Sequence, residues 1–311
     1  MYPDVSYLLH DIFGTQPDNW LSVFKIYGIF LFLGIYIASK VFEREINNKL
    51  GILFKGGAEK VLPHNFRDNI LLIASLSGII GSKVIVLIED YTVFFNNNIY
   101  DAVFKKTGIS FYGGFLGAAF TLIFYFRKEK INLLPALDAA APAVLIGYSL
   151  GRLGCHFSGD GDWGVVSNVQ PSWWFLPDWV WGFDFPHNVA NKGTWIEDCT
   201  FRYCKILEQP VFPTSLYESI SCFALFLLIL MVKSCFSKLD GAIFSIYLIL
   251  GGFERFAIEF IRVNEKYKFE DLWLSQAQFI SIVLVALGSL LLLYITYSFK
   301  NKRMVGSQNS L

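Results

Sequence analysis

Long apolar runs separated by short polar connections dominate this 311-residue chain. A bilayer core of about 30 Å needs roughly 20 mostly apolar residues in each crossing helix. Seven segments meet or approach this length, so the pattern predicts an all-α integral membrane protein with about seven transmembrane helices, forming a single polytopic domain over residues 1–311. The predicted spans are Leu21–Ser39, Asn69–Ile88, Ile109–Phe126, Leu134–Leu153, Ser215–Cys235, Ala242–Ile261 and Gln276–Ser298.

The fourth span is interrupted by Asp138, Pro142 and Arg152. Such residues are tolerated at membrane depth where neighbouring protein satisfies them. We therefore expect a tilted or broken helix that is buried in protein rather than in lipid.

Basic residues predict the orientation, because cytoplasmic loops carry an excess of Lys and Arg. The loops after spans one, three and five and the C-terminal tail together hold 14 of them, against 8 in the longer opposite connections. The N-terminus is thus expected outside and the C-terminus in the cytoplasm. The first basic residue is Lys25, so no cleavable signal peptide is evident and the first span is expected to remain as an anchor.

The connection 155–213, here called the cap segment, is the longest between predicted spans and holds six of the eight tryptophans. Trp favours the water–lipid interface, which predicts a Trp-rich extracytoplasmic cap lying on the membrane; an ordinary loop with a Trp-rich core is the alternative. Cys199 and Cys204 fall together in this segment. They form either a disulfide in an oxidising compartment or free thiols.

Composition agrees with a membrane protein and narrows the partners. Hydrophobic residues make up 54% of the chain and charged residues 17%, against roughly 45–50% and about 25% in soluble domains. The formal net charge is zero, so nucleic-acid binding has no electrostatic support. No Gly-rich phosphate-binding loop followed by Lys and Ser or Thr is present, and we predict no cofactor and no metal.

The segment Gly151–Gly164 places an arginine, a histidine and two acids among five glycines, directly after an apolar run. Glycines favour a non-helical backbone here, and charge entering a membrane is usually functional. Arg152 is therefore predicted to hold an anionic group, with snorkelling to the interface as the alternative. Asp160 and Asp162 are candidates for the same site or simple loop acids.

A second charged run lies in the sixth span. Arg255 and Glu259 are four residues apart, on one helix face, and Arg262 follows three residues later. A structural ion pair is the plain interpretation of Arg255 and Glu259. Two separate arginines near the outer leaflet, Arg152 and Arg255, favour phosphate recognition, because guanidinium binds phosphate oxygens in a bidentate fork.

A third polar feature begins the third span, where Tyr112 precedes Gly113 and Gly114. Glycines at helical spacing permit close helix approach, and packing is the better interpretation of Gly114 and Gly117. The glycine pair beside Tyr112 also brings backbone close to a phenol.

Together these residues resemble the prolipoprotein diacylglyceryl transferase family of bacterial inner membranes, over most of the chain. The matching motifs are Tyr27-Gly28, Asp138 with Pro142, Gly151–Gly154 with Trp163-Gly164, Pro213–Glu218, and the run Arg255-Phe256, Glu259-Phe260 and Arg262. The family usually has histidine where Tyr112 stands, asparagines at Cys155 and Ser158, and tyrosine at Gly251. One extra residue leaves open whether Asp160 or Asp162 replaces the signature glutamate.

The resemblance implies transfer of a diacylglyceryl group from phosphatidylglycerol to a cysteine thiol of a prolipoprotein signal peptide, with glycerol phosphate leaving. It implies catalytic roles for Arg152, Arg255 and Tyr112, the last orienting lipid rather than accepting a proton, because a phenol is a poor base at neutral pH. Glu259 would fix Arg255. The substrate-binding candidates are Tyr27, Gly113, Gly114, Gly154, Asp160, Asp162, Glu218, Glu259 and Arg262. A non-catalytic lipid- or lipopeptide-binding protein, a transferase using another thiol or headgroup, and a membrane transporter are the alternatives.

Overall fold

The computed structural model describes residues 1–49, 65–89, 110–264, 266–269 and 272–308, which are mostly helical. Contacts group the chain into two compact units, Met1–Phe42 with Ala140–Leu311, and Glu43–Ala139. The prediction of one polytopic domain stays a prediction. The elements are α1 (Val5–Phe13), η1 (Trp20–Val23), α2 (Ile26–Asn47), α4 (Phe66–Glu89), α7 (Phe111–Lys128), α8 (Leu133–Ser158), α9 (Asp178–Trp181), β1 (Thr194–Trp195), β2 (Lys205–Ile206), α10 (Thr214–Val232), η3 (Lys233–Phe236), α11 (Ala242–Ile258), β3 (Lys266–Phe269), β4 (Leu272–Ser275) and α12 (Gln276–Gln308).

A helix occupies each of the seven positions predicted from the apolar runs. Within the described residues, five stretches are long and apolar enough to cross a membrane: α2, most of α4, α8, α10 with η3, and residues 276–301 of α12. An all-α, multi-pass membrane protein is therefore confirmed. The other two helices, α7 and α11, have 18 and 17 residues. Seven crossings stay a prediction.

The fourth span corrects one expectation. Helix α8 is unbroken from Leu133 to Ser158, with Pro142 inside it, and it continues through the glycines that we expected to end it. Packing explains this, because a Cβ on Gly154 would lie 2.8 Å from the Cβ of Phe30 in α2. Glycine thus lets the two helices approach closely, and this contact offsets its low helix propensity. The expected burial in protein is found, because 56% of the most apolar 18-residue stretch of α8 is buried.

In the larger unit, α8, α10 and α11 share a core. It consists of Ala141, Leu145, Cys222, Ile229 and Ile243. The hydroxyl of Ser149 donates to the carbonyl oxygen of Ser219 at 2.8 Å, which joins α8 to α10 without leaving a polar group unpaired. These contacts fix the three helices that carry the charged residues of the site.

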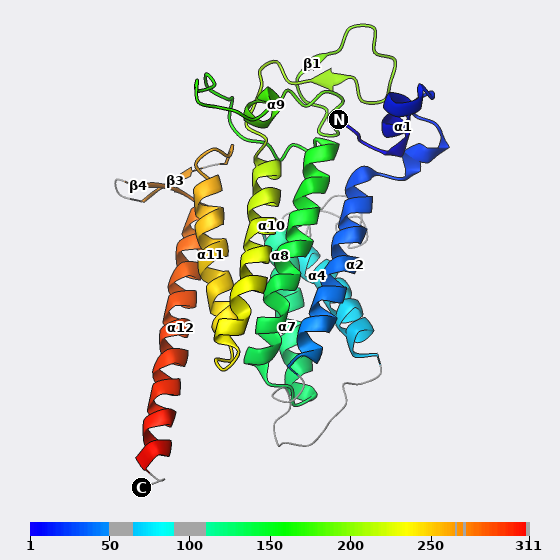
Figure 1. Ribbon diagram of the computed structural model, residues 1–311. Coiled ribbons are helices and arrows are strands. Elements are labelled where there is room, and N and C mark those ends of the chain that lie inside the picture. Colours follow the sequence, from blue (N-terminus) through cyan, green and yellow to red (C-terminus); the bar gives the residue numbers. More distant parts are fainter. Residues whose placement is uncertain (50–64, 90–109, 265, 270–271, 309–311) are drawn as a thin grey trace. The chain divides into compact units, whose positions relative to one another are not determined.

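The cap segment and the N-terminal region lie at the same end of the larger unit, and the C-terminal end of α12 lies at the other (Figure 1). The amide of Tyr203 donates to the hydroxyl of Tyr7 at 3.0 Å. Burial raises the pKa of Tyr7 to about 12, so this phenol stays neutral.

Cys199 and Cys204 form a disulfide beside the two-stranded antiparallel ladder of β1 and β2.

The tryptophans of the cap segment occupy both packed and exposed positions. Trp174 and Trp181 pack edge to face with ring centroids 4.9 Å apart, and Trp181 also contacts Phe212, so these rings form a small core. Trp173 and Trp195 are 69% and 70% exposed, as an interfacial role requires. A cap lying on a membrane surface stays a prediction.

Candidate active site

Charged side chains from α8, the cap segment, α10 and the end of α11 converge at the cap end of the larger unit. Three guanidinium groups alternate there with three carboxylates. We call this set the ion-pair cluster: Arg152, Asp162, Glu218, Arg255, Glu259 and Arg262. Arg152 and Arg255, 103 positions apart by their numbers, are thus brought to one place, as phosphate recognition by both requires.

Glu218 is the centre of the ion-pair cluster. Its side chain is fully buried and lies in the first turns of α10. Oε2 contacts Nε of Arg152, while Oε1 lies 2.6 Å from Nη1 of Arg255 and 3.3 Å from Nη1 of Arg262. The sequence prediction placed Glu218 at the substrate. In the structure its oxygens orient the arginines, and substrate contact by Glu218 stays a prediction.

A short backbone ladder positions Asp162. The amide of Gly164 donates to the carbonyl oxygen of Phe212 at 2.8 Å, and the amide of Val165 donates to that of Ile261 at 2.8 Å. This part of the cap segment is thus held between the residues just before α10 and those just after α11. A Cβ at Gly164 would lie 2.5 Å from the carbonyl oxygen of Ile261. Only glycine permits this approach, which holds Asp162 over the arginines.

Asp160 and Asp162 differ in their contacts with the arginines. The carboxylate of Asp162 bridges Nη1 of Arg152 and Nη2 of Arg262. Asp160 instead accepts from the amide of Asp162 at 3.2 Å and is exposed. Asp162 is therefore the acid of the two that pairs with the arginines, and Asp160 shapes the loop before it; which of them replaces the signature glutamate stays a prediction.

The charged run of the sixth span extends past the end of its helix. Helix α11 ends at Ile258, Glu259 is the capping residue, and Arg262 lies beyond the helix where it pairs through its backbone with Gly164. Nη2 of Arg255 lies 3.2 Å from Oε2 of Glu259, as the four-residue spacing predicted. Nη1 of Arg262 lies 3.3 Å from Oε1 of Glu218, and its Nε lies 4.0 Å from Oε2 of Glu259, three residues earlier.

The charges of the ion-pair cluster balance, with three cations against three anions. Buried ions require this pairing, because an isolated one costs several kcal/mol. Arg152 is 8% exposed, and its Nη2 has no hydrogen-bond partner among the described residues. A buried guanidinium donor without a partner is available to a ligand, and phosphate oxygens are acceptors that fit its planar fork.

Three further polar residues surround the cluster and were not among the predicted site residues. The hydroxyl of Tyr148, one helical turn before Arg152, donates to Oε2 of Glu218 at 3.4 Å. Glu254 and Ser221 meet between α11 and α10 at 2.9 Å. A carboxyl group inside a predicted span was a sequence signal for Glu254. Nothing in the spacing distinguished Tyr148 from an ordinary core residue.

The remaining candidates of the larger unit lie beside Arg152. Tyr27 begins α2, is 42% exposed, and its backbone would lie 3.5 Å from a Cβ on Gly154. Sγ of Cys155 lies 3.7 Å from Nη1 of Arg152.

Cys155, Asp160 and Asp162 each offer a possible metal-ligand atom within 4.8 Å of the others. The two guanidiniums on Asp162 oppose a cation there, so this group does not indicate a metal centre.

The smaller unit carries the other candidates, in helix α7. Gly113 packs against Gly81 of α4, where an added Cβ would lie 2.5 Å from the Gly81 carbonyl oxygen. Gly117 makes a similar contact with Ser77, so packing is confirmed for it. Substrate contact by Gly113 and Gly114 stays a prediction, and the side chain of Tyr112 lies outside the described atoms.

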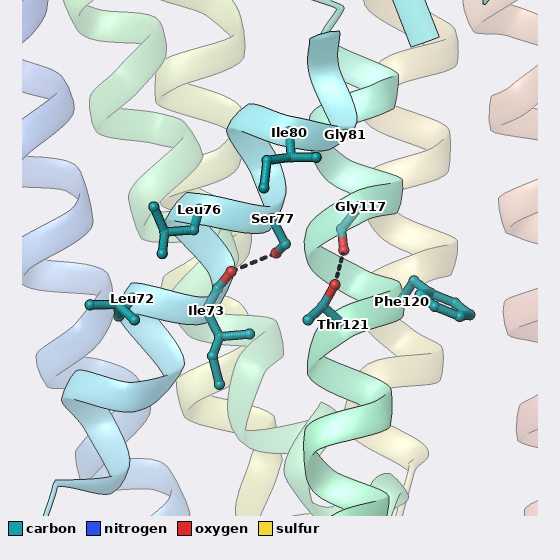
Figure 2. A pocket seen from close by; sticks show the side chains of 9 residues that line it. All are labelled: Leu72, Ile73, Leu76, Ser77, Ile80, Gly81, Gly117, Phe120 and Thr121. Atoms are coloured by element: carbon teal, nitrogen blue, oxygen red, sulfur yellow. Dashed lines mark hydrogen bonds between the residues drawn. The ribbon is translucent and has the colours of Figure 1, made fainter. Parts of the chain in front are cut away.

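An open apolar groove of about 450 Å³ lies along the same two helices, α4 and α7. Figure 2 shows its aliphatic and aromatic walls, with Leu76 on α4 and Phe120 on α7. The hydroxyls of Ser77 and Thr121 donate to carbonyl oxygens of their own helices (Figure 2). The groove therefore offers a ligand no side-chain hydroxyl that is free of a backbone bond.

Comparisons with known proteins agree on one family. The family model described as prolipoprotein diacylglyceryl transferase matches residues 21–294. Proteins named phosphatidylglycerol–prolipoprotein diacylglyceryl transferase are similar to most of the chain. The one from Leptospira interrogans is 25% identical, covering 86% of this chain and 87% of its own. Those from Dehalococcoides mccartyi strain BAV1 and Clostridium novyi are 30% and 26% identical, covering 88% and 94% of this chain and 89% and 96% of their own.

Proposed function

The chain belongs to the prolipoprotein diacylglyceryl transferase family, and from that premise we propose that it transfers the diacylglyceryl group of phosphatidylglycerol to the cysteine thiol of a prolipoprotein signal peptide. The product is a thioether, and glycerol phosphate leaves. One observation carries the proposal, which is that guanidinium groups from α8 and α11 meet at the buried carboxylate of Glu218. Two fixed cations at one place suit a phosphate that must be bound and then expelled.

The reaction is a displacement at the glycerol carbon that bears the phosphate ester. The substrate thiolate attacks this carbon, the carbon–oxygen bond breaks, and the electron pair leaves with the phosphate oxygen. Arg152 and Arg255 hold the phosphate and stabilise its growing charge. Glu218 and Glu259 hold these two guanidiniums in place, so little reorganisation is needed as the charge develops.

Other residues orient the lipid head and the acceptor. Tyr27 and Gly154 flank Arg152 and are assigned to the glycerol headgroup, together with the loop of Asp160 and Asp162. Arg262 adds a third cation to the phosphate site. Tyr112, with Gly113 and Gly114, orients the lipid by a phenol hydrogen bond rather than removing a proton.

We place the protein in the bacterial inner membrane with seven crossings, the N-terminus outside and the C-terminus in the cytoplasm. The Cys199–Cys204 disulfide supports an oxidising compartment for the cap segment. Cys235, an exposed thiol in η3, reports the orientation. A membrane-impermeant maleimide added to spheroplasts should modify a S172C variant in the cap segment but reach Cys235 only after permeabilisation.

The function is tested with purified protein, phosphatidylglycerol and a peptide carrying the acceptor cysteine of a prolipoprotein. We expect a thioether product whose mass exceeds that of the peptide by the diacylglyceryl group, and a loss of product in R152K and R255K. Lipid or peptide binding without turnover would support the non-catalytic alternative. Solute or ion flux in vesicles without thioether formation would support a transporter.

A further inference from the structure

Glu254 is a carboxyl group inside α11 for which the proposed chemistry has no use. It precedes Arg255 directly, yet within the described part of the chain it makes no ion pair, because the cluster's guanidiniums are held by Asp162, Glu218 and Glu259. Its hydrogen bond is with Ser221 of α10, at 2.9 Å. An unpaired carboxylate at this depth would be costly, whereas a protonated carboxyl is not.

The surroundings of Ser221 also favour a proton on Glu254. Oγ of Ser221 lies 3.1 Å from the carbonyl oxygen of Glu218 and 2.9 Å from Oε1 of Glu254. A serine hydroxyl has one proton and can donate to only one of these oxygens. Both contacts become hydrogen bonds when Glu254 carries a proton and donates to Ser221. The pair then forms a short chain of hydrogen bonds that ends on the α10 backbone.

Depth distinguishes this pair from the ion-pair cluster. Ser221 lies three residues further into α10 than Glu218, a rise of about 4.5 Å, and Glu254 adjoins Arg255 but lies five residues, about 7.5 Å, before Glu259. The headgroup and interfacial region of a bilayer is roughly 5–8 Å thick on each side of the hydrocarbon core. A lipid whose phosphate lies at the outer side of the ion-pair cluster, with its acyl chains running along α10 and α11, would have its ester groups near the level of Glu254 and Ser221.

We infer that Glu254, in its protonated form and supported by Ser221, donates a hydrogen bond to an ester carbonyl of the bound glycerolipid. On lipid binding the Glu254 proton turns to the carbonyl, and Ser221 turns its own proton to Oε1 of Glu254. This contact would set the height of the glycerol carbon under the phosphate and make the protein selective for ester over ether lipids. The inference rests on the proposed function, since it assumes a phospholipid at the ion-pair cluster.

The experiment compares diester phosphatidylglycerol with its dialkyl ether analogue, which lacks both carbonyls but keeps the headgroup and chains. Thioether formation is measured for the wild type, E254Q, E254L and F253L, the last a control at a neighbouring side chain that is 58% exposed. We expect the wild type and F253L to prefer the ester lipid by about ten-fold in kcat/KM, the value of one well-placed hydrogen bond. E254Q, which keeps a donor, should keep most of this preference, and E254L should lose it through a lower rate on the ester lipid alone.

Equal losses of E254L on both lipids, or a wild type that does not distinguish them, would overturn the inference. Should E254L not accumulate in folded form, S221A tests the same preference, which should fall by several-fold. An infrared measurement on bound lipid with ¹³C-labelled ester carbonyls separates this proposal from the proposed function. A shift of the carbonyl band to lower frequency in the wild type and F253L, absent in E254L, supports the subsite even if no thioether forms; an unshifted band in the wild type refutes it.

Discussion

Substituting Glu218 by Gln tests the centre of the ion-pair cluster, because the amide keeps the shape and removes one negative charge. Three guanidiniums then face only Asp162 and Glu259. Removing one partner of a buried ion pair costs about 3–5 kcal/mol. We expect about 3 kcal/mol, the lower end, because the Arg255 side chain is 26% exposed and solvent screens part of its charge.

The same variant should separate binding from catalysis. The site gains a net positive charge, so KM for the anionic lipid should not rise. The rate constant kcat should fall by about 10²–10³, because the guanidiniums lose the carboxylate that orients them toward the leaving phosphate. Unfolding in detergent is followed by circular dichroism, and thioether formation is normalised to folded protein. D138N is the matched control, since Asp138 is also buried and pairs with Lys49 at 2.7 Å, within the smaller unit. E218Q with wild-type kcat would refute the reasoning.

Three other changes have definite expectations. G164A should destabilise the protein by about 1–3 kcal/mol and lower activity, because its Cβ meets the Ile261 carbonyl oxygen at 2.5 Å; unchanged thermal unfolding would contradict this. The double variant C199S/C204S should lose about 2 kcal/mol of cap-segment stability and become more sensitive to limited proteolysis, with equal digestion of both proteins as the contrary result. Y112F should lower kcat/KM by about ten-fold if the phenol orients lipid, and full activity would exclude that role.

The places of the helices could be predicted from the sequence because a span of about 20 apolar residues satisfies its own backbone in lipid. Their ends could not. Helix α8 passes through Gly151 and Gly154, since packing on α2 outweighs the local preference of glycine. Conversely, α11 stops before Arg262, because the backbone beyond it pairs with Gly164 of the cap segment. Both differences come from tertiary contacts that a local pattern does not contain.

The candidate site could likewise be predicted from the sequence only in part. An intramembrane arginine is costly enough to be noticed from sequence alone, which is why Arg152 and Arg255 were predicted. The place of Glu218 depends on partners 37 and 44 residues away, and spacing along the chain does not indicate which oxygen faces which guanidinium. Likewise, Asp160 and Asp162 differ by two positions in one loop, and only the backbone ladder decides which of them reaches the arginines.

The neutrality of the ion-pair cluster restricts how a phosphate enters it. An added anion would leave an unbalanced charge unless one carboxylate moves out toward water. Glu218 and Glu259 are fully buried and fixed on or at the end of helices, whereas Asp162 is 27% exposed and lies on a loop. Asp162 is therefore the carboxylate that we expect the phosphate to displace. Its displacement would free one donor each of Arg152 and Arg262. These donors would add to Nη2 of Arg152, which has no partner among the described residues. The lipid headgroup would then arrive on the face where Tyr27 and Gly154 lie, and the two buried carboxylates would keep the arginines in place throughout the reaction.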